Sequence, residues 1–188
     1  MLSSPNGAQR INSFALVTYV PEPLGSFLDR LRQEIVPSRV AYHPHVTILP
    51  PRPLTEPPET AWETLHSHLQ HLAPFMIEAT DVDYFGVTSV IYLGVGGGRR
   101  ELEYMHNLLN TDALAVAEPH PYCPHITLAQ GLLPSELTEV KEFARRKWAE
   151  CHLSKWFPGE TFTFVQNTSQ NEWVDLAEFT LRPLASVR

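Results

Sequence analysis

The stretch YHPHVT at residues 42–47 recurs as YCPHIT at residues 122–127. Both copies follow the pattern Tyr-x-Pro-His-(β-branched apolar)-Thr, in the same order and without gaps. A chain of this composition is expected to contain only about 0.002 copies of so long a pattern by chance. Two copies therefore mark an internal repeat, and we expect two parts of similar plan.

Each copy of the repeat is expected to form a β-strand from its histidine onward. Side chains alternate between the two faces of a strand, so His45 and Thr47 share one face and Val46 points to the other. By the same alternation His125 and Thr127 share one face of the second copy. If a pseudo-twofold axis relates the two parts, the histidines and threonines face one another across a cleft.

The rest of the chain predicts an α+β fold. Apolar runs and alternating patterns indicate strands, and apolar residues at helical spacing indicate helices. Because the two kinds of element do not alternate strictly, we expect two pseudo-symmetric lobes of sheet and helix around a central cleft. The predicted strands are 13–20, 45–49, 76–85, 87–95, 125–129, 161–166 and 172–181, and the predicted helices are 23–35, 59–72, 102–109 and 137–151.

The expected domain organisation is simple. Residues 1–12 are polar and are expected to form a flexible lead-in, followed by one two-lobed domain at 13–182 and a tail at 183–188.

Two imidazoles and two hydroxyls that converge on one small volume suit the hydrolysis of a phosphate ester. The unperturbed pKa of imidazole is about 6.5, so near neutral pH one histidine can accept a proton while the other donates one. Acid–base catalysis of this kind typically contributes about 10²- to 10⁴-fold per proton transfer. The threonine hydroxyls can hold the phosphate oxygens. We expect this chemistry to require no metal and no cofactor.

The paired H-x-T motifs, HVT at 45–47 and HIT at 125–127, resemble the 2H phosphoesterase superfamily, which groups 2′-5′ RNA ligase-like proteins and 2′,3′-cyclic phosphodiesterases. The resemblance implies a metal-independent RNA-processing hydrolase that attacks a cyclic or 2′-5′ phosphodiester, with RNA ligation as a side activity. It also implies that His45 is the acid, His125 the base, and Thr47 and Thr127 the phosphate anchors. Substrate orientation can reverse the acid and base roles.

One departure from the family pattern concerns basic residues. Several members carry a basic residue shortly after the second motif, where this chain has Gln130. Positive charge for the phosphate is therefore expected from elsewhere, with Arg39 and Arg52 as candidates. Tyr42 and Tyr122 are candidates for stacking on a nucleobase, and packing beside the prolines is the favoured alternative for both rings.

Three other features have ordinary structural interpretations. His68 and His71 share a predicted helix face, but no acid or cysteine nearby completes a metal-binding set. The glycines of residues 94–98 lack the residues of a Walker loop and favour a plain strand-to-helix turn. Cys123 has no matched partner for nucleophilic chemistry.

Charge and composition limit the partners. The chain has 188 residues with 14 Lys+Arg against 21 Asp+Glu, a net charge of −7. Duplex-binding proteins need a positive face, so we expect a nucleotide or short RNA as substrate rather than duplex DNA. The sequence shows no disulfide framework, no signal peptide and no apolar stretch of membrane-spanning length. We therefore expect a cytoplasmic monomer without membrane association.

Two alternatives to the phosphodiesterase remain open. One is a nuclease that cuts cyclic oligonucleotides with the same four residues. The other is a nucleotide-binding module that keeps the cleft without turnover, which predicts stabilisation by the ligand without product.

Overall fold

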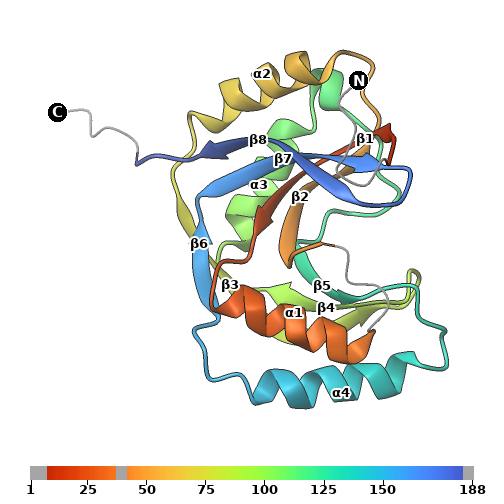
Figure 1. Cartoon of the computed structure of the whole chain (residues 1–188). Helices are drawn as coiled ribbons and strands as arrows, with labels where there is room; N and C mark the ends of the chain where they lie inside the picture. Colours follow the sequence, from red (N-terminus) through yellow and green to blue (C-terminus); the bar gives the residue numbers. More distant parts are fainter. Residues whose placement is uncertain (1–7, 37–41, 184–188) are drawn as a thin grey trace.

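The computed structural model describes residues 8–36 and 42–183, which form an eight-stranded sheet and four α-helices (Figure 1). The predicted α+β class is confirmed. The strands are β1 (Arg10–Tyr19), β2 (His45–Arg52), β3 (Phe75–Phe85), β4 (Val90–Val95), β5 (His125–Ala129), β6 (Trp156–Gly159), β7 (Thr161–Thr168) and β8 (Trp173–Thr180). The helices are α1 (Leu24–Ile35), α2 (Pro58–Leu69), α3 (Arg99–Leu109) and α4 (Leu137–Ala149), with a short 3₁₀ helix η1 (Asp112–Leu114).

The sheet consists of two four-stranded lobes that meet at its centre. Its order is β6-β3-β4-β5-β2-β1-β7-β8, and all neighbouring strands are antiparallel. The first lobe is β2-β1-β7-β8 and the second is β5-β4-β3-β6. In each lobe the innermost strand carries one H-x-T motif and lies beside the strand that precedes it in the chain. The order read outward from the β2–β5 junction therefore has pseudo-twofold symmetry.

Each half of the chain contributes strands and helices to both lobes. Helix α1 links β1 to β2 in the first lobe but packs against β5 of the second, while α3 links β4 to β5 and packs against β2 of the first. Helix α4 lies beside α1 under the second lobe, and α2 lies near α3 on the first (Figure 1). The repeat predicted two lobes of similar plan, and each of them is built from both halves of the chain.

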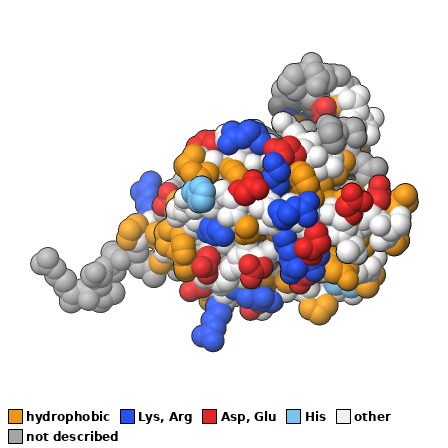
Figure 2. Space-filling view, turned by 90° about the horizontal axis from the view of Figure 1, so that it is seen from below, with side chains coloured by type: hydrophobic (Ala, Val, Ile, Leu, Met, Phe, Trp, Pro, Cys, Tyr) orange, Lys and Arg blue, Asp and Glu red, His pale blue; other side chains and the backbone are white. Residues whose placement is uncertain are grey.

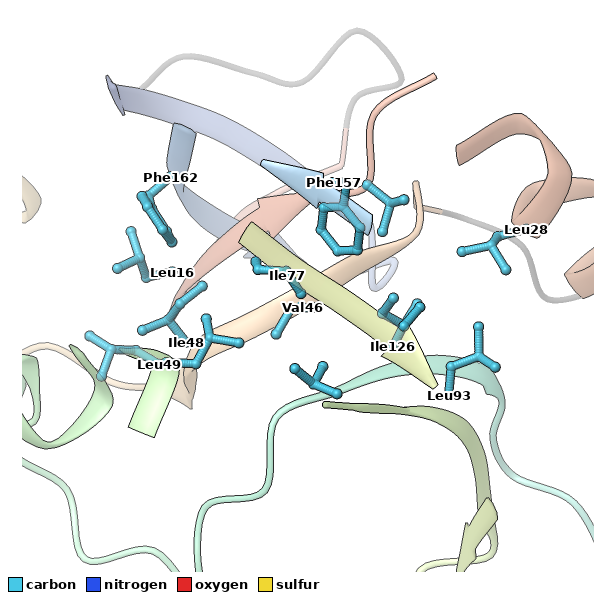
Figure 3. Packing of buried hydrophobic residues seen from close by; sticks show 14 of the residues in the cluster. Leu16, Leu28, Val46, Ile48, Leu49, Ile77, Leu93, Ile126, Phe157 and Phe162 are labelled. Atoms are coloured by element: carbon cyan, nitrogen blue, oxygen red, sulfur yellow. The ribbon is translucent and has the colours of Figure 1, made fainter. Parts of the chain in front are cut away.

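The hydrophobic core continues across the junction of the lobes. The middle residues of the two motifs, Val46 and Ile126, have no exposed surface and belong to the main cluster of buried side chains (Figure 3). Leu28 of α1 and Phe162 of β7 are buried in the same cluster. Burial of side chains of this size contributes about 1.5–3 kcal/mol each. The apolar middle residues therefore anchor the strands that carry the polar ones.

Strand β2 extends to Arg52 through Pro50 and Pro51, which were predicted to end it. Proline cannot donate a ladder hydrogen bond and is tolerated only where that bond is not needed. Strand β2 pairs with β5 only near its start, and its register with β1 shifts between Leu16 and Phe14. The N–H groups that Pro50 and Pro51 lack would therefore lie where β2 forms no regular hydrogen-bonded pairing with β1 or β5.

Two further segments differ from the prediction. Strand β1 begins at Arg10, which pairs with Thr168 of β7, so the lead-in expected at residues 1–12 extends too far. The short strand β6 was not predicted because Pro158-Gly159 is typical of a turn. Its proline is tolerated because β6 forms one edge of the sheet.

The outer face formed by α1 and α4 carries interspersed basic and acidic side chains (Figure 2). A salt bridge of 3.0 Å joins Lys147 of α4 to Glu34 of α1. Among the helices of the described residues, none combines the length and the apolar character needed to cross a membrane.

Candidate active site

The two motifs meet where the lobes join. Val46 of β2 lies directly opposite Ile126 of β5 in the antiparallel ladder. Residues directly opposite each other have Cβ atoms about 4.5–5.5 Å apart, and diagonal neighbours lie about 7–8 Å apart. This one pairing therefore sets the distances between the polar residues on either side of it.

The four polar residues of the motifs form a quadrilateral on one face of this junction. Extending the register by one residue in each direction places His45 opposite Thr127 and Thr47 opposite His125. The histidines occupy one diagonal and the threonines the other. All four are partly exposed, whereas the residues between them are buried. The structure thus brings together the residues that the repeat singled out.

Each histidine ring is held by the same local hydrogen bond. Nδ1 of His45 lies 2.8 Å from the carbonyl oxygen of His43, and Nδ1 of His125 lies 2.7 Å from that of Cys123. Because a carbonyl oxygen only accepts, each Nδ1 donates its hydrogen and each Nε2 is left for proton transfer. The proline between ring and carbonyl favours the extended backbone that this bond uses. This explains why each motif has a proline before its histidine.

Aromatic side chains flank both rings. Two tyrosines lie near the ring of His45, and a phenylalanine and a tyrosine lie near that of His125. The distances between ring centroids are 6.2 Å for Tyr19 and 5.4 Å for Tyr42 to His45, and 5.0 Å for Phe85 and 5.3 Å for Tyr92 to His125.

The two histidines differ in their electrostatic surroundings. The pKa of His45 is lowered to about 4, mainly by burial; the hydrogen bond to the His43 carbonyl opposes the change, and the charges of Arg32 and His125 add to it. Burial also lowers the pKa of His125, against the hydrogen bond to the Cys123 carbonyl.

A cleft of about 1350 Å³ opens beside Thr47 and His125. Three segments form most of its walls: residues 84–90 around the β3–β4 turn, residues 116–123 before β5, and Gln170 and Asn171 in the β7–β8 turn. A small adjoining recess contains Thr127. The apolar and aromatic side chains on the cleft walls include Tyr42, Tyr84, Phe85, Val87, Val90, Val116, Pro119, Pro121 and Tyr122.

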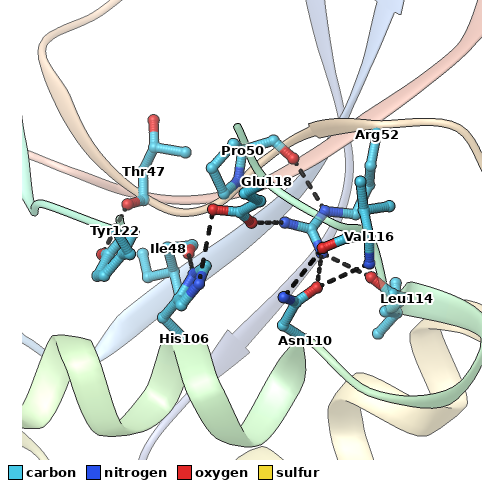
Figure 4. Close-up of polar contacts among 10 residues, drawn as sticks. All are labelled: Thr47, Ile48, Pro50, Arg52, His106, Asn110, Leu114, Val116, Glu118 and Tyr122. Atoms are coloured by element: carbon cyan, nitrogen blue, oxygen red, sulfur yellow. Dashed lines mark hydrogen bonds and ion pairs between the residues drawn. The ribbon is translucent and has the colours of Figure 1, made fainter. Parts of the chain in front are cut away.

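The wall segment 116–123 is fixed by a buried arginine (Figure 4). Arg52, only 2% exposed, donates to Oε1 of Glu118 at 2.7 Å, to Oδ1 of Asn110 at 2.7 Å and to the carbonyl of Leu114 at 2.6 Å. Asn110 in turn exchanges hydrogen bonds with the backbone of Val116. The hydrogen bonds of the Arg52 guanidinium thus tie β2 to Asn110, Leu114 and Glu118.

The same network reaches the first motif through two rings (Figure 4). Nε2 of His106 lies 3.6 Å from Glu118, and its Nδ1 lies 2.8 Å from the carbonyl of Ile48. The ring of His106 stacks on Tyr122 with centroids 4.0 Å apart and planes 2° apart. The hydroxyl of Tyr122 donates to the backbone carbonyl of Thr47 at 2.8 Å. The cleft wall therefore supports β2, the strand that carries Thr47.

These contacts bear on two sequence-based candidates. Arg52 was a candidate for supplying positive charge to the phosphate; it lines the cleft, and its guanidinium is engaged by Glu118, Asn110 and the Leu114 carbonyl. Tyr122 was a candidate for stacking on a nucleobase, but it stacks on His106, as the packing alternative proposed. Arg39 lies outside the described residues.

Tyr42, the first residue of the first motif, borders the site and reaches the residue that follows β5. Its ring lies beside His45, and its hydroxyl accepts a hydrogen bond of 2.8 Å from Gln130. Sequence reasoning did not identify Arg32, His106 or Glu118 as supporting residues. His106 and Arg32 each had a sequence signal, because each directly follows a buried apolar residue on the apolar face of its helix, Met105 on α3 and Leu31 on α1.

Among the residues that the structure describes, no three His, Cys, Asp or Glu side chains are grouped closely enough to hold a metal ion.

The glycine run before α3 forms the turn that was predicted. Gly98 has a φ of 79°, and a Cβ there would lie 2.5 Å from the carbonyl oxygen of Met76.

A two-lobed antiparallel sheet with one H-x-T motif on each inner strand defines a class of protein by both fold and site. A sequence profile described as the 2'-5' RNA ligase superfamily matches residues 20–168. The chain therefore belongs to this superfamily, and the resemblance of the paired motifs is confirmed.

Two relatives share part of the sequence. A Staphylococcus haemolyticus protein whose name describes it as a phosphoesterase is 32% identical over 99 residues, covering 52% of this chain and 58% of the relative. An Oceanobacillus iheyensis protein with a similar name is 32% identical over 111 residues, covering 54% of this chain and 65% of the relative. The chain thus matches about three fifths of the length of these relatives.

Solved structures share the fold at low sequence identity. Apo LigT of E. coli aligns over 93% of this chain and 98% of its own, with a TM-score of 0.64 and 18% identity. Usb1 of Kluyveromyces marxianus aligns over 88% of this chain and 97% of its own, with a TM-score of 0.52 and 10% identity.

Replacing Glu118 by glutamine should destabilise the protein, because the buried charge of Arg52 loses its counter-ion. We expect the free energy of unfolding, measured by urea denaturation, to fall by about 2–4 kcal/mol. The matched control is Glu103→Gln, which removes the partner of the exposed Arg99 at 2.8 Å and should cost no more than about 1 kcal/mol. Equal losses in the two variants would contradict the supporting role of the buried pair.

Proposed function

We propose that the protein is a metal-independent phosphodiesterase that hydrolyses 2′,3′-cyclic phosphate or 2′-5′-linked nucleotides. The observation that carries this proposal is the diagonal placement of two histidines and two threonines around the β2–β5 junction. This arrangement provides an acid, a base and two hydroxyl donors for one phosphate. The narrow span of the quadrilateral favours a single phosphate group as the reacting centre.

The proposed reaction is an attack by water on phosphorus. One histidine Nε2 accepts a proton from the water as its oxygen bonds to phosphorus. The bond from phosphorus to the leaving oxygen breaks, and the other histidine Nε2 donates a proton to that oxygen. The products are a phosphomonoester and a free hydroxyl. In ligation, the 5′-hydroxyl of a second RNA takes the place of water, bonds to the phosphorus of a 2′,3′-cyclic phosphate and opens the ring, so no water is consumed. Hydroxyl donors from Thr47 and Thr127 hold the non-bridging oxygens.

The electrostatics favour His45 as base and His125 as acid. Arg32 and His125 both disfavour a proton on His45, and its pKa of about 4 leaves it neutral at pH 7. A neutral ring with Nδ1–H already bonded presents the lone pair of Nε2 to water. Burial lowers the pKa of His125 as well, but the charge of Arg32 acts on His45 alone. The negative phosphate favours a proton on the pair, so we assign that proton to His125. This reverses the assignment that the family resemblance implied, as substrate orientation allows.

The comparisons support a nucleotide substrate. Relatives are named as phosphoesterases. Among the structures with the same fold, LigT has been solved in complex with 3'-AMP and with phosphate. The aromatic and amide side chains of the cleft walls suit a sugar and a nucleobase beyond the phosphate.

Substrate turnover tests the proposal directly. With EDTA present, we expect activity on at least one of nucleoside 2′,3′-cyclic monophosphates, cyclic-phosphate-ended RNA and 2′-5′ oligoadenylate. His45→Ala and His125→Ala should each reduce kcat by about 10²- to 10⁴-fold, and Thr47→Val and Thr127→Val each by about 10²-fold. The exposed His152 gives a matched control, since His152→Ala should leave kcat unchanged.

If the protein hydrolyses no substrate of this panel, the proposed phosphodiesterase activity is contradicted. Binding of these nucleotides without product would instead support the nucleotide-binding module. Turnover of cyclic oligonucleotides alone would support the nuclease alternative.

An aryl phosphodiester separates the acid from the base. A p-nitrophenolate leaving group departs without protonation, so it needs no general acid. We expect His125→Ala to lose much less activity on a nucleoside p-nitrophenyl phosphate than on a cyclic phosphate, while His45→Ala loses similar activity on both. The opposite pattern, with His45→Ala rescued by the aryl ester, would show that His45 is the acid.

A further inference from the structure

A buried arginine lies behind the phosphate site, in a place that sequence reasoning did not identify. The recess that adjoins the cleft has a volume of about 20 Å³ and is lined by Arg32 of α1 together with Tyr42, Thr127 and Gln130. Arg32 is 4% exposed. The recess therefore brings a permanent cation beside one of the two proposed phosphate anchors.

The guanidinium of Arg32 is held rigidly by the first motif. Its NH1 donates to the backbone carbonyl of Tyr42 at 2.7 Å, and its central carbon lies 4.9 Å from the centroid of the Tyr42 ring. Asp29, one turn earlier on α1, lies 3.5 Å away. Helix α1 packs against β5, the strand of Thr127. These contacts fix the charge relative to both motifs.

The position of Arg32 lets its charge act on the reacting groups. The ring of Tyr42 lies between the arginine and the site, with its centroid 5.4 Å from that of His45. A charge removed from water acts more strongly and over a longer distance than one on the surface. The charge of Arg32 contributes to the lowered pKa of His45, which agrees with this geometry.

We propose that Arg32 is a positioning residue of the phosphate site: its buried charge, held against Tyr42 in the recess that Thr127 also lines, attracts the substrate phosphate to the space between the two motifs. It acts through space rather than by touching the reacting atoms. The inference rests on the proposed function, because it assumes that the phosphate binds between the two motifs.

Several other titratable or charged groups face His45, and each is accounted for. Tyr19 of β1 donates to Asp175 of β8 at 2.6 Å, so that carboxylate is already engaged. Asp29 is shared between Arg32 and the exposed His43. Among the residues that the structure describes, the other groups near the ring are Tyr42 and His125.

The test compares a variant that removes the positive charge of Arg32 with a variant that replaces it by another cation. Arg32→Met removes the charge, and Arg30→Met removes an exposed charge from the same helix. Arg32→Lys keeps a cation only while the buried ammonium stays protonated, so this variant is compared at a pH where NMR shows the lysine protonated. We expect Arg32→Met to lower kcat/KM by about 10-fold and to move the acidic limb of its pH profile to higher pH. Arg32→Lys should keep the wild-type limb, and Arg30→Met should match the wild type in both.

Two readouts are independent of turnover. NMR titration of the His45 ring should show a higher pKa in Arg32→Met than in the wild type, and binding of inorganic phosphate should weaken. These measurements test Arg32 even if no nucleotide of the panel is hydrolysed, so failure of the inference and failure of the proposed function are distinguishable. Thermal melting checks that each variant is folded, and Arg32→Lys supplies the comparison if Arg32→Met does not fold.

Two results would overturn the inference. One is an unchanged His45 titration and unchanged phosphate binding in folded Arg32→Met. The other is an equal defect in Arg32→Lys and Arg32→Met, which would assign the effect to lost hydrogen bonds rather than to lost charge.

Discussion

The pairing of Val46 with Ile126 is the contact on which the rest of the structure depends. It joins the two lobes into one sheet and lies on the pseudo-twofold axis between the motifs. Both side chains are fully buried, so the pairing is anchored by the core. Since strand side chains alternate, burying the middle residue of each motif turns its histidine and threonine to the other face. One apolar contact thus determines where four polar groups meet.

The symmetry of the backbone does not extend to the surroundings of the two histidines. Both rings donate from Nδ1 to the carbonyl two residues earlier, at nearly equal distances. Tyr42 borders His45, on which the charge of Arg32 also acts, whereas Phe85 and Tyr92 border His125. Duplicated motifs therefore supply two equivalent groups, and the unequal charges around them favour one as base and the other as acid.

The sequence predicted the local elements and the motif strands better than it predicted the supports of the site. The two motifs could be recognised because alternation and repetition are encoded within a few residues. Contacts such as Arg52 with Glu118, or Arg32 with Tyr42, join segments whose proximity depends on tertiary packing. Arg52 illustrates the difficulty: an arginine beside a motif suits a phosphate ligand, yet the extension of β2 buries it.

A crystal structure with a ribonucleoside vanadate ester, which mimics five-coordinate phosphorus, tests the central claim most directly. The account predicts that vanadate oxygens lie within hydrogen-bond distance of Nε2 of His45 and His125 and of the hydroxyls of Thr47 and Thr127. A vanadate that contacts the side chains of only one motif, or that binds elsewhere in the cleft, would contradict it.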